Sequence, residues 1–141
     1  MGEEYLDILD ENGNKTGKVR TYNESHEKGF IHSAVHVWIL NNKNEILIQK
    51  RSSNMRFYPG HWDVSASGHV SASETSLEAA RKEVKEELGL DIEESKFKFL
   101  CRIYESFVSG KYINKEFNKI FVTKYDFDID NMKLLKKRWR V

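Results

Sequence analysis

Cysteine and proline are almost absent from this chain of 141 residues, which contains one of each. Because Cys101 is the only cysteine, an intramolecular disulfide and a zinc site built from several thiolates are both excluded. The single proline and the eight glycines exclude collagen-like, proline-rich and low-complexity chains. We therefore expect a chain that folds around one core in a reducing compartment.

A long apolar run is also missing, and so is an excess of charge of one sign. No stretch approaches the roughly 18 apolar residues of a membrane span, and acidic Glu3 and Glu4 stand where a signal peptide would be basic. The 23 Lys and Arg residues nearly balance the 22 Asp and Glu residues, so no global field favours nucleic acid. These absences predict a cytoplasmic protein without a nucleic-acid or membrane partner.

The chain does contain many strand-like segments and one strong helical pattern. Runs of β-branched and aromatic residues between turn residues predict strands over 4–9, 16–22, 30–40, 45–50, 62–68, 97–107 and 116–125. Asn12-Gly13 is typical of a tight hairpin, and residues 30–50 predict an antiparallel central hairpin. From Ser73 the apolar period becomes 3.6, which predicts a helix over 74–89 that ends at Gly89. This order predicts an α+β domain whose mixed sheet packs on the helix.

Three acidic residues of the predicted helix lie beside its apolar stripe. Glu83, Glu86 and Glu87 fall within an arc of roughly 100°. Like charges four residues apart cost about 0.2–0.5 kcal/mol, so a cation should compensate, and Mg²⁺ prefers carboxylate oxygens together with phosphates. A solvent-exposed helix in which Lys82 and Lys85 pair with the acids is the second interpretation.

The segment before the helix favours the first interpretation. Gly68 permits a sharp transition from strand to loop, and Glu74 opens the helix near its positive dipole end. A motif resembling the Nudix box runs from Gly68 to Leu90. Five residues separate Gly68 from Glu74, and eight more separate Glu74 from Glu83-Val84-Lys85-Glu86-Glu87-Leu88-Gly89-Leu90. The resemblance implies an α/β/α sandwich, with a mixed sheet on which the box helix packs.

The resemblance to the Nudix family also implies an activity and its residues. Members cleave a diphosphate linkage in small molecules of the NDP-X type by attack of water at phosphorus. The implied catalytic residues are Glu83, Glu86, Glu87 and Lys82, with one glutamate as the base. Glu83, Glu86 and Glu87 would hold Mg²⁺, or alternatively Mn²⁺, while Glu74 orients the box or supports another metal. Lys82 stands where the family usually has arginine. Arginine binds carboxylates with two parallel hydrogen bonds, whereas lysine offers only a point charge.

Segments outside the box resemble one branch of the family, the type I isopentenyl diphosphate isomerases. They are Ile31-His32-Ser33-Ala34-Val35, Tyr58-Pro59-Gly60-His61-Trp62 and Ser67-Gly68-His69, and the likeness extends over most of residues 3–125. This likeness implies substrate-binding roles for His32, Gly68, His69, Tyr104 and Glu116, with His26 as a looser match to a metal-binding histidine. His32 and His69 could instead be ordinary core histidines.

Two substitutions weaken the isomerase interpretation. Ser67 stands where the isomerases have a cysteine, and Asn114 replaces an acidic metal ligand. A hydroxyl has a far higher pKa than a thiol, so Ser67 is poorly suited to proton transfer. We therefore favour a hydrolase, with an isomerase and a non-catalytic diphosphate sensor as alternatives.

The last nine residues, 133–141, include five basic ones. They predict a solvated end rather than an element with an apolar face. We expect residues 1–141 to form one Nudix domain that lacks part of the usual closing elements. A sheet face left uncovered in this way would favour a homodimer.

Overall fold

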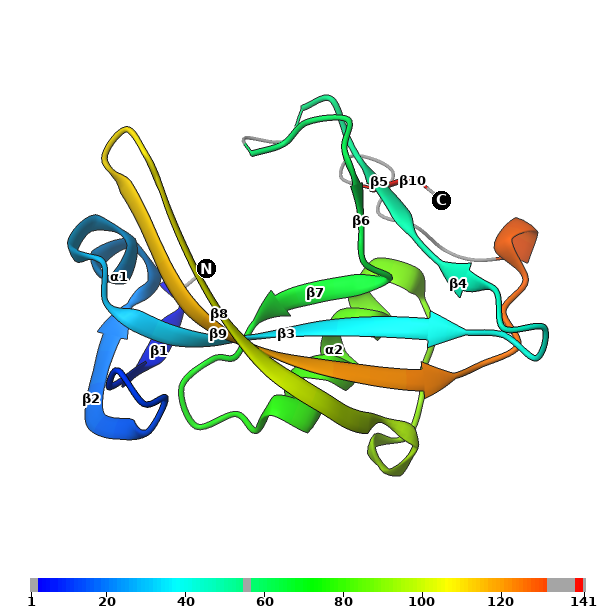
Figure 1. Cartoon of the computed structure of the whole chain (residues 1–141), viewed down its shortest axis with the longest axis horizontal. Helices are drawn as coiled ribbons and strands as arrows, with labels where there is room; N and C mark the ends of the chain where they lie inside the picture. The colour runs from blue at the N-terminus through cyan, green and yellow to red at the C-terminus, as the bar shows by residue number, and fades with distance from the viewer. Residues whose placement is uncertain (1–2, 55–56, 132–138, 141) are drawn as a thin grey trace.

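The computed structural model describes residues 3–54, 57–131 and 139–140. Its elements are β1 (Tyr5–Leu9), β2 (Lys15–Thr21), α1 (Tyr22–Lys28), β3 (Ile31–Leu40), β4 (Ile46–Leu47), β5 (Gln49–Arg51), β6 (Trp62–Asp63), β7 (Ala66–His69), α2 (Ser76–Leu88), the 3₁₀ turn η1 (Glu94–Lys96), β8 (Lys98–Ser109), β9 (Tyr112–Lys124), the 3₁₀ turn η2 (Ile129–Asn131) and β10 (Trp139–Arg140). Figure 1 shows a twisted sheet with α2 behind it. The predicted α+β class is confirmed.

Parallel pairing of β3 with β9 forms the centre of the main sheet. Ile31–Leu40 of β3 face residues 115–124 of β9 in continuous register, and β8 pairs antiparallel with the outer side of β9. β7 and β4 pair antiparallel with β3 on its other side. The predicted antiparallel hairpin is present but short: β3 and β4 share two residue pairs, and β5 then joins a smaller sheet with β6 and β10.

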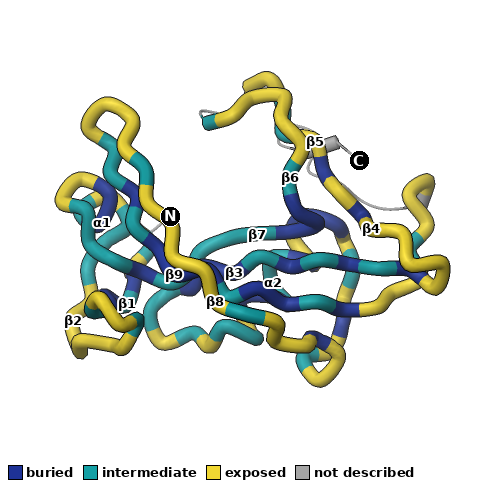
Figure 2. The backbone as a smooth tube through the Cα atoms, viewed as in Figure 1, coloured by how far each residue is buried: buried dark blue, intermediate teal, exposed yellow. Residues whose placement is uncertain are grey.

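Helix α2 packs its apolar stripe on β3 and β7. Thr75 and Glu78 form a reciprocal capping box at its start, and Gly89 adopts a left-handed φ of 72° at its end. The core includes Val35, Val37 and Ile39 of β3, Ala66 of β7, and Ala79, Ala80, Val84 and Leu88 of α2. Figure 2 shows the buried stretches of the backbone along β3 and β9. The predicted apolar stripe therefore packs in the core, and the acidic face of α2 beside it is left free of the core.

The short helix α1 is the element that the sequence analysis missed. Thr21 caps it by accepting a hydrogen bond from the Glu24 N–H, and Gly29 ends it with a φ of 74°. Seven mostly polar residues carry no apolar period, so pattern alone does not reveal a helix here. The spacing of Thr21, Glu24 and Gly29 was the available signal, because it combines a capping pattern with a terminating glycine.

The predicted first hairpin is confirmed, with Gly13 at a φ of 84° in its turn. The predicted basic tail lies mostly outside the described residues, which include only Trp139–Arg140 from it. These two residues pair antiparallel with Lys50 and Arg51 of β5. In the described part of the chain, every helix is too short or too polar to span a membrane.

Candidate functional site

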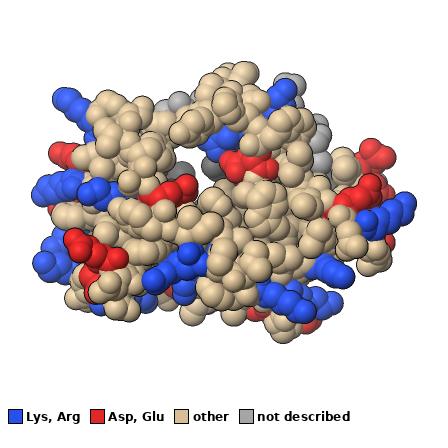
Figure 3. Space-filling view, viewed as in Figure 1, with Lys and Arg blue, Asp and Glu red and all other residues tan. Residues whose placement is uncertain are grey.

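A cavity of about 450 Å³ opens where α2, β7, β3, β9 and α1 meet. Its lining residues are Glu4, Tyr22, Ala34, His36, Arg51, Phe57, Ser67, Gly68, His69, Glu83, Glu86, Tyr112 and Glu116. The space-filling view shows the surface hollowed between the tip of the β8–β9 hairpin and the segment that joins β5 to β6 (Figure 3). Acidic and basic side chains from distant parts of the sequence therefore face one space.

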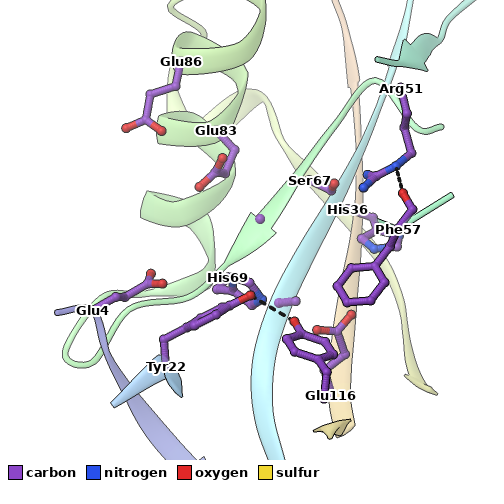
Figure 4. A pocket seen from close by; sticks show the side chains of 13 residues that line it. Glu4, Tyr22, His36, Arg51, Phe57, Ser67, His69, Glu83, Glu86 and Glu116 are labelled. Carbon is purple, nitrogen blue, oxygen red and sulfur yellow. Dashed lines mark hydrogen bonds between the residues drawn. The ribbon is translucent and has the colours of Figure 1, made fainter. Parts of the chain in front are cut away.

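Carboxylates of α2 form one wall of this cavity. Figure 4 shows the Glu83 and Glu86 side chains projecting from the helix, beside the strand that carries Ser67. A Cβ placed on Gly68 would overlap the Glu83 carboxyl group, so Gly68 gives that carboxylate its space. Gly68 lies inside β7, so its expected role at a strand-to-loop transition is wrong. Glu4, which precedes β1, adds a third carboxylate to the wall.

Glu87, the third acid of the predicted arc, is turned toward the strand. Only 1% of its surface is exposed, and its Oε1 accepts a hydrogen bond of 3.1 Å from the Ser67 backbone N–H. The α2 carboxylates do not form a compact set of metal ligands by themselves. Among the described residues, no group of three possible ligand atoms within 4.8 Å of one another includes an α2 carboxylate. The helix therefore presents Glu83 and Glu86 to the cavity and anchors Glu87 beside them.

Lys82 and Glu74 form an ion pair outside the acidic wall. Lys82 Nζ lies 3.2 Å from Glu74 Oε2, and Glu74 Oε1 accepts from the Ser71 backbone N–H at 3.1 Å. Partial burial lowers the pKa of Lys82, but the hydrogen bond to Glu74 and the neighbouring acids raise it by more. Glu74 lines a different cavity from Glu83. Glu74 therefore contacts the loop that leads into α2 and does not line the cavity that Glu83 and Glu86 face.

Three histidines from three elements converge beside the acidic wall. Ring nitrogens of His26 on α1, His32 on β3 and His69 on β7 lie within 4.8 Å of one another. His32 is fully buried, and its Nε2, 3.4 Å from Glu116 Oε2, makes no hydrogen bond to any residue that the structure describes. His26 Nδ1 donates to the Tyr22 carbonyl at 2.8 Å, and its Nε2 lies 3.0 Å from Asn114 Oδ1. His26, which matches the isomerases less closely than His32 and His69 do, therefore belongs to the same cluster.

Burial favours the neutral form of two of these imidazoles. It lowers the pKa of His69 to about 4, helped by repulsion from His32, and it lowers the pKa of His26 as well. Burial alone would raise the pKa of Glu116, but its contact with His32 and the nearby imidazoles lower that pKa instead. Neutral imidazoles next to a carboxylate are suitable ligands for a transition metal.

The pairing of β8 with β9 places Glu105, and not Tyr104, on the face of the sheet that carries Glu116. Glu105 stands opposite Glu116, whereas Tyr104 stands opposite Phe117 and therefore faces the other side of the sheet. The Tyr104 ring packs on Phe117 at 5.0 Å between centroids. The structure does not bring Tyr104 to the cavity, while His36, Glu105 and Glu116 form a second group of ligand atoms within 4.8 Å.

Several lining residues were not identified from the sequence. Arg51 donates from Nε to the Phe57 carbonyl at 2.8 Å, and its Nη1 lies 3.3 Å from Asp63 Oδ2. The hydroxyl groups of Tyr22 and Tyr112 lie 2.9 Å apart, and both residues line the cavity. These residues come from α1, β5, a loop and β9, so only the tertiary fold reveals their common position.

A family model and the curated relatives of this chain indicate the same family. The family model described as a NUDIX domain matches residues 30–129. The chain is 40% identical over 125 residues to Nudix hydrolase 3 of Arabidopsis thaliana; the match covers 86% of this chain and 16% of that protein. It is also 28% identical to isopentenyl-diphosphate Delta-isomerase 2 of Photorhabdus laumondii, covering 88% of this chain and 68% of that one.

A solved structure shares the fold. The crystal structure of DR0079 from Deinococcus radiodurans superimposes with a TM-score of 0.70 at 22% identity, covering 96% of this chain and 82% of that one. The chain belongs to the Nudix family, as its box predicted.

Proposed function

We propose that this member of the Nudix family is a Mg²⁺-dependent hydrolase that cleaves a diphosphate linkage in a small molecule by attack of water at phosphorus. The observation that carries the proposal is the placement of the Glu83 carboxylate against Gly68, beside Glu86, on the wall of the 450 Å³ cavity. Only glycine allows the backbone to approach the Glu83 carboxylate this closely, which is typical of a functional position.

The donor groups suit a hard divalent cation. Glu83, Glu86 and Glu87 offer carboxylate oxygens, which Mg²⁺ and Mn²⁺ both accept, and the space above Gly68 keeps one of these carboxylates next to the strand. These three residues would hold the ion. When bound, it would neutralise phosphate oxygens and lower the pKa of a water molecule.

The residues of the chain supply orientation and proton acceptance. The Ser67 N–H fixes the Glu87 carboxylate, so that one oxygen always faces the strand. Glu83 or Glu86 can take the proton from the attacking water, since both face the cavity. Lys82 holds Glu74, which binds the Ser71 N–H and thereby sets the loop that leads into α2. Arg51 places positive charge on the opposite wall, where it would attract phosphate.

An isomerase is the second candidate, because His26, His32, His69 and Glu116 gather beside the cavity. Three positions argue against it. Ser67 lacks the acidity for proton transfer to carbon, Asn114 faces His26 with an amide, and Tyr104 lies on the other side of the sheet. A non-catalytic sensor is less well supported, since Lys82 preserves the ion pair with Glu74.

The experiment that tests the proposal is incubation with Mg²⁺ and a panel of diphosphates, followed by identification of the products. The panel comprises nucleoside diphosphate derivatives, thiamine diphosphate and isopentenyl diphosphate. We expect at least one phosphorus–oxygen linkage to be cleaved and isopentenyl diphosphate not to be isomerised. Formation of dimethylallyl diphosphate would support the isomerase instead, and tight binding without any product would support the sensor.

A homodimer stays a prediction. The edge strand β8 offers apolar side chains that are more than half exposed, namely Phe99, Leu100, Ile103 and Val108. An exposed edge of this kind favours pairing with another chain. Light scattering would show a mass near twice 16.6 kDa if the prediction holds, and a monomer at high concentration would contradict it.

A further inference from the structure

Among the carboxylates that the structure places on the acidic wall, only Glu4 comes from outside α2. It lies just before β1, far from the box in the chain. Figure 4 shows the Glu4 side chain below those of Glu83 and Glu86, at the left of the view. Like charges that share one cavity repel each other, so an additional acid here costs stability and is typical of a functional position.

Three hydrogen bonds fix the position of Glu4. Its backbone carbonyl accepts from the Tyr22 N–H at 2.8 Å, and the carbonyl of the next residue, Tyr5, accepts from the Ala72 N–H at 2.7 Å. In the side chain, Glu4 Oε2 accepts from the Ser71 hydroxyl at 2.9 Å. The backbone and the carboxylate are therefore tied to α1 and to the loop that leads into α2.

The contact with Ser71 connects Glu4 to the box. The Ser71 N–H donates to Glu74 Oε1 at 3.1 Å, and Lys82 Nζ lies 3.2 Å from Glu74 Oε2. Lys82, Glu74, Ser71 and Glu4 thus form a continuous chain of polar contacts that begins on α2. Glu74 therefore holds the residue whose hydroxyl orients the Glu4 carboxylate.

The second oxygen of Glu4 is available to a molecule in the cavity. Glu4 Oε1 makes no hydrogen bond and no ion pair with any residue that the structure describes, and the hydroxyl group on Oε2 is neutral. A carboxylate that holds a divalent ion is kept in its ionised form by the charge of the ion and accepts a proton less readily. Glu83 and Glu86 can therefore accept a proton only through an oxygen that stays clear of the ion, whereas this restriction does not apply to Glu4.

We propose that Glu4 is a catalytic residue that accepts the proton of the attacking water, with Ser71 as its positioning residue. An O–H bond of the water breaks and its proton passes to Glu4 Oε1, while the water oxygen forms a bond to phosphorus. The bridging oxygen leaves phosphorus with the electron pair of the broken bond and remains on the other product. The inference rests on the proposed function, because it requires attack of water at phosphorus.

Glu4→Gln keeps the size of the side chain and a hydrogen-bond acceptor for Ser71, but an amide does not take up a proton. We expect this variant to lower kcat for a cleaved diphosphate at least about 100-fold, which is the scale of general-base catalysis. The dissociation constant for Mn²⁺ alone, measured by electron paramagnetic resonance, should stay unchanged because the α2 acids remain. Glu3→Gln is the matched control, since Glu3 is exposed and does not line the cavity, and it should change neither quantity.

Ser71→Ala tests the positioning role. It removes the hydroxyl that binds Glu4 Oε2 and should lower kcat at least about tenfold without raising KM, because a misplaced acceptor slows the chemical step and not substrate binding. Ser71→Thr retains a hydroxyl group and should restore most of the rate. A thermal unfolding curve for each variant separates these effects from a loss of fold.

A folded Glu4→Gln protein that keeps the rate of the parent would overturn the inference. A rate that falls together with the Mn²⁺ affinity would also overturn it, because Glu4 would then hold the ion and not accept the proton. Both results require a parent protein that hydrolyses a diphosphate, so they would leave the proposed function standing. A parent protein that hydrolyses no diphosphate of the panel would instead overturn the proposed function, and the role of Glu4 with it.

Discussion

The Glu83 carboxyl group lies directly over the α-carbon of Gly68, where any side chain would overlap it. Helix α2 and strand β7 therefore meet at a point that combines close backbone approach with an ionisable group. Nearby, Glu87 binds the Ser67 N–H, and Glu86 faces the same cavity as Glu83.

Gly68→Ala should reduce hydrolysis at least about tenfold while the protein stays folded, because displacement of a single positioned group by an ångström can cost that much or more. Steady-state kinetics and thermal unfolding would check this. Gly17→Ala is the control for a destabilising methyl group away from the cavity: Gly17 has open space around it but a left-handed φ of 85°, so we expect lower stability with full activity. Full activity in Gly68→Ala would show that the position of Glu83 is unimportant.

Glu86→Gln and Glu87→Gln should each lower the turnover rate at least about 100-fold, which is the scale of removing one electrostatic group from a transition state. Glu86→Gln should leave stability unchanged because Glu86 is exposed, whereas Glu87→Gln replaces a buried hydrogen-bonded carboxylate. Circular dichroism would confirm that both variants fold. Activity within a few-fold of the parent in both variants would refute the assignment of the metal to α2.

Ser67→Cys alone should not produce an isomerase, because Asn114 would still face His26 with an amide in place of a carboxylate. Ser67→Cys combined with Asn114→Glu is the fairer test, with dimethylallyl diphosphate measured as the product. Isomerisation by the unmodified protein would show that the choice of a hydrolase is wrong.

Stability of the metal-free protein should fall as the pH is lowered below about 6.5. The pKa of His69 is about 4 in the folded chain against 6.5 for the free side chain, so the unfolded chain binds the proton more tightly between these values. At about 1.4 kcal/mol per pH unit, the loss attributable to His69 approaches about 3 kcal/mol by pH 4. Urea unfolding in a chelator would measure it.

His69→Gln should flatten that pH dependence, and His26 should account for part of the remainder because its pKa is also lowered. A free energy of unfolding that is constant or rises toward acidic pH would contradict the burial of neutral imidazoles.

Local signals in the sequence predicted the parts of the site that lie within one segment. The apolar period and Gly89 located α2, and the spacing from Gly68 to Glu83 identified the family. Other features depend on pairing between distant strands. A shift of one residue in the β8–β9 register decides whether Tyr104 or Glu105 faces the cavity, and no local pattern fixes that register. Arg51 and Tyr22 likewise enter the site only through the tertiary fold.

The most direct test of the proposed function is hydrolysis in isotopically labelled water with Mg²⁺, with mass spectrometry of both phosphorus-containing products. Attack of water at phosphorus predicts the label in one phosphate product, loss of the reaction in a chelator, and loss of at least about 99% of the rate in Glu86→Gln. Products without label, or a labelled product formed equally well by Glu86→Gln, would contradict a hydrolase centred on α2.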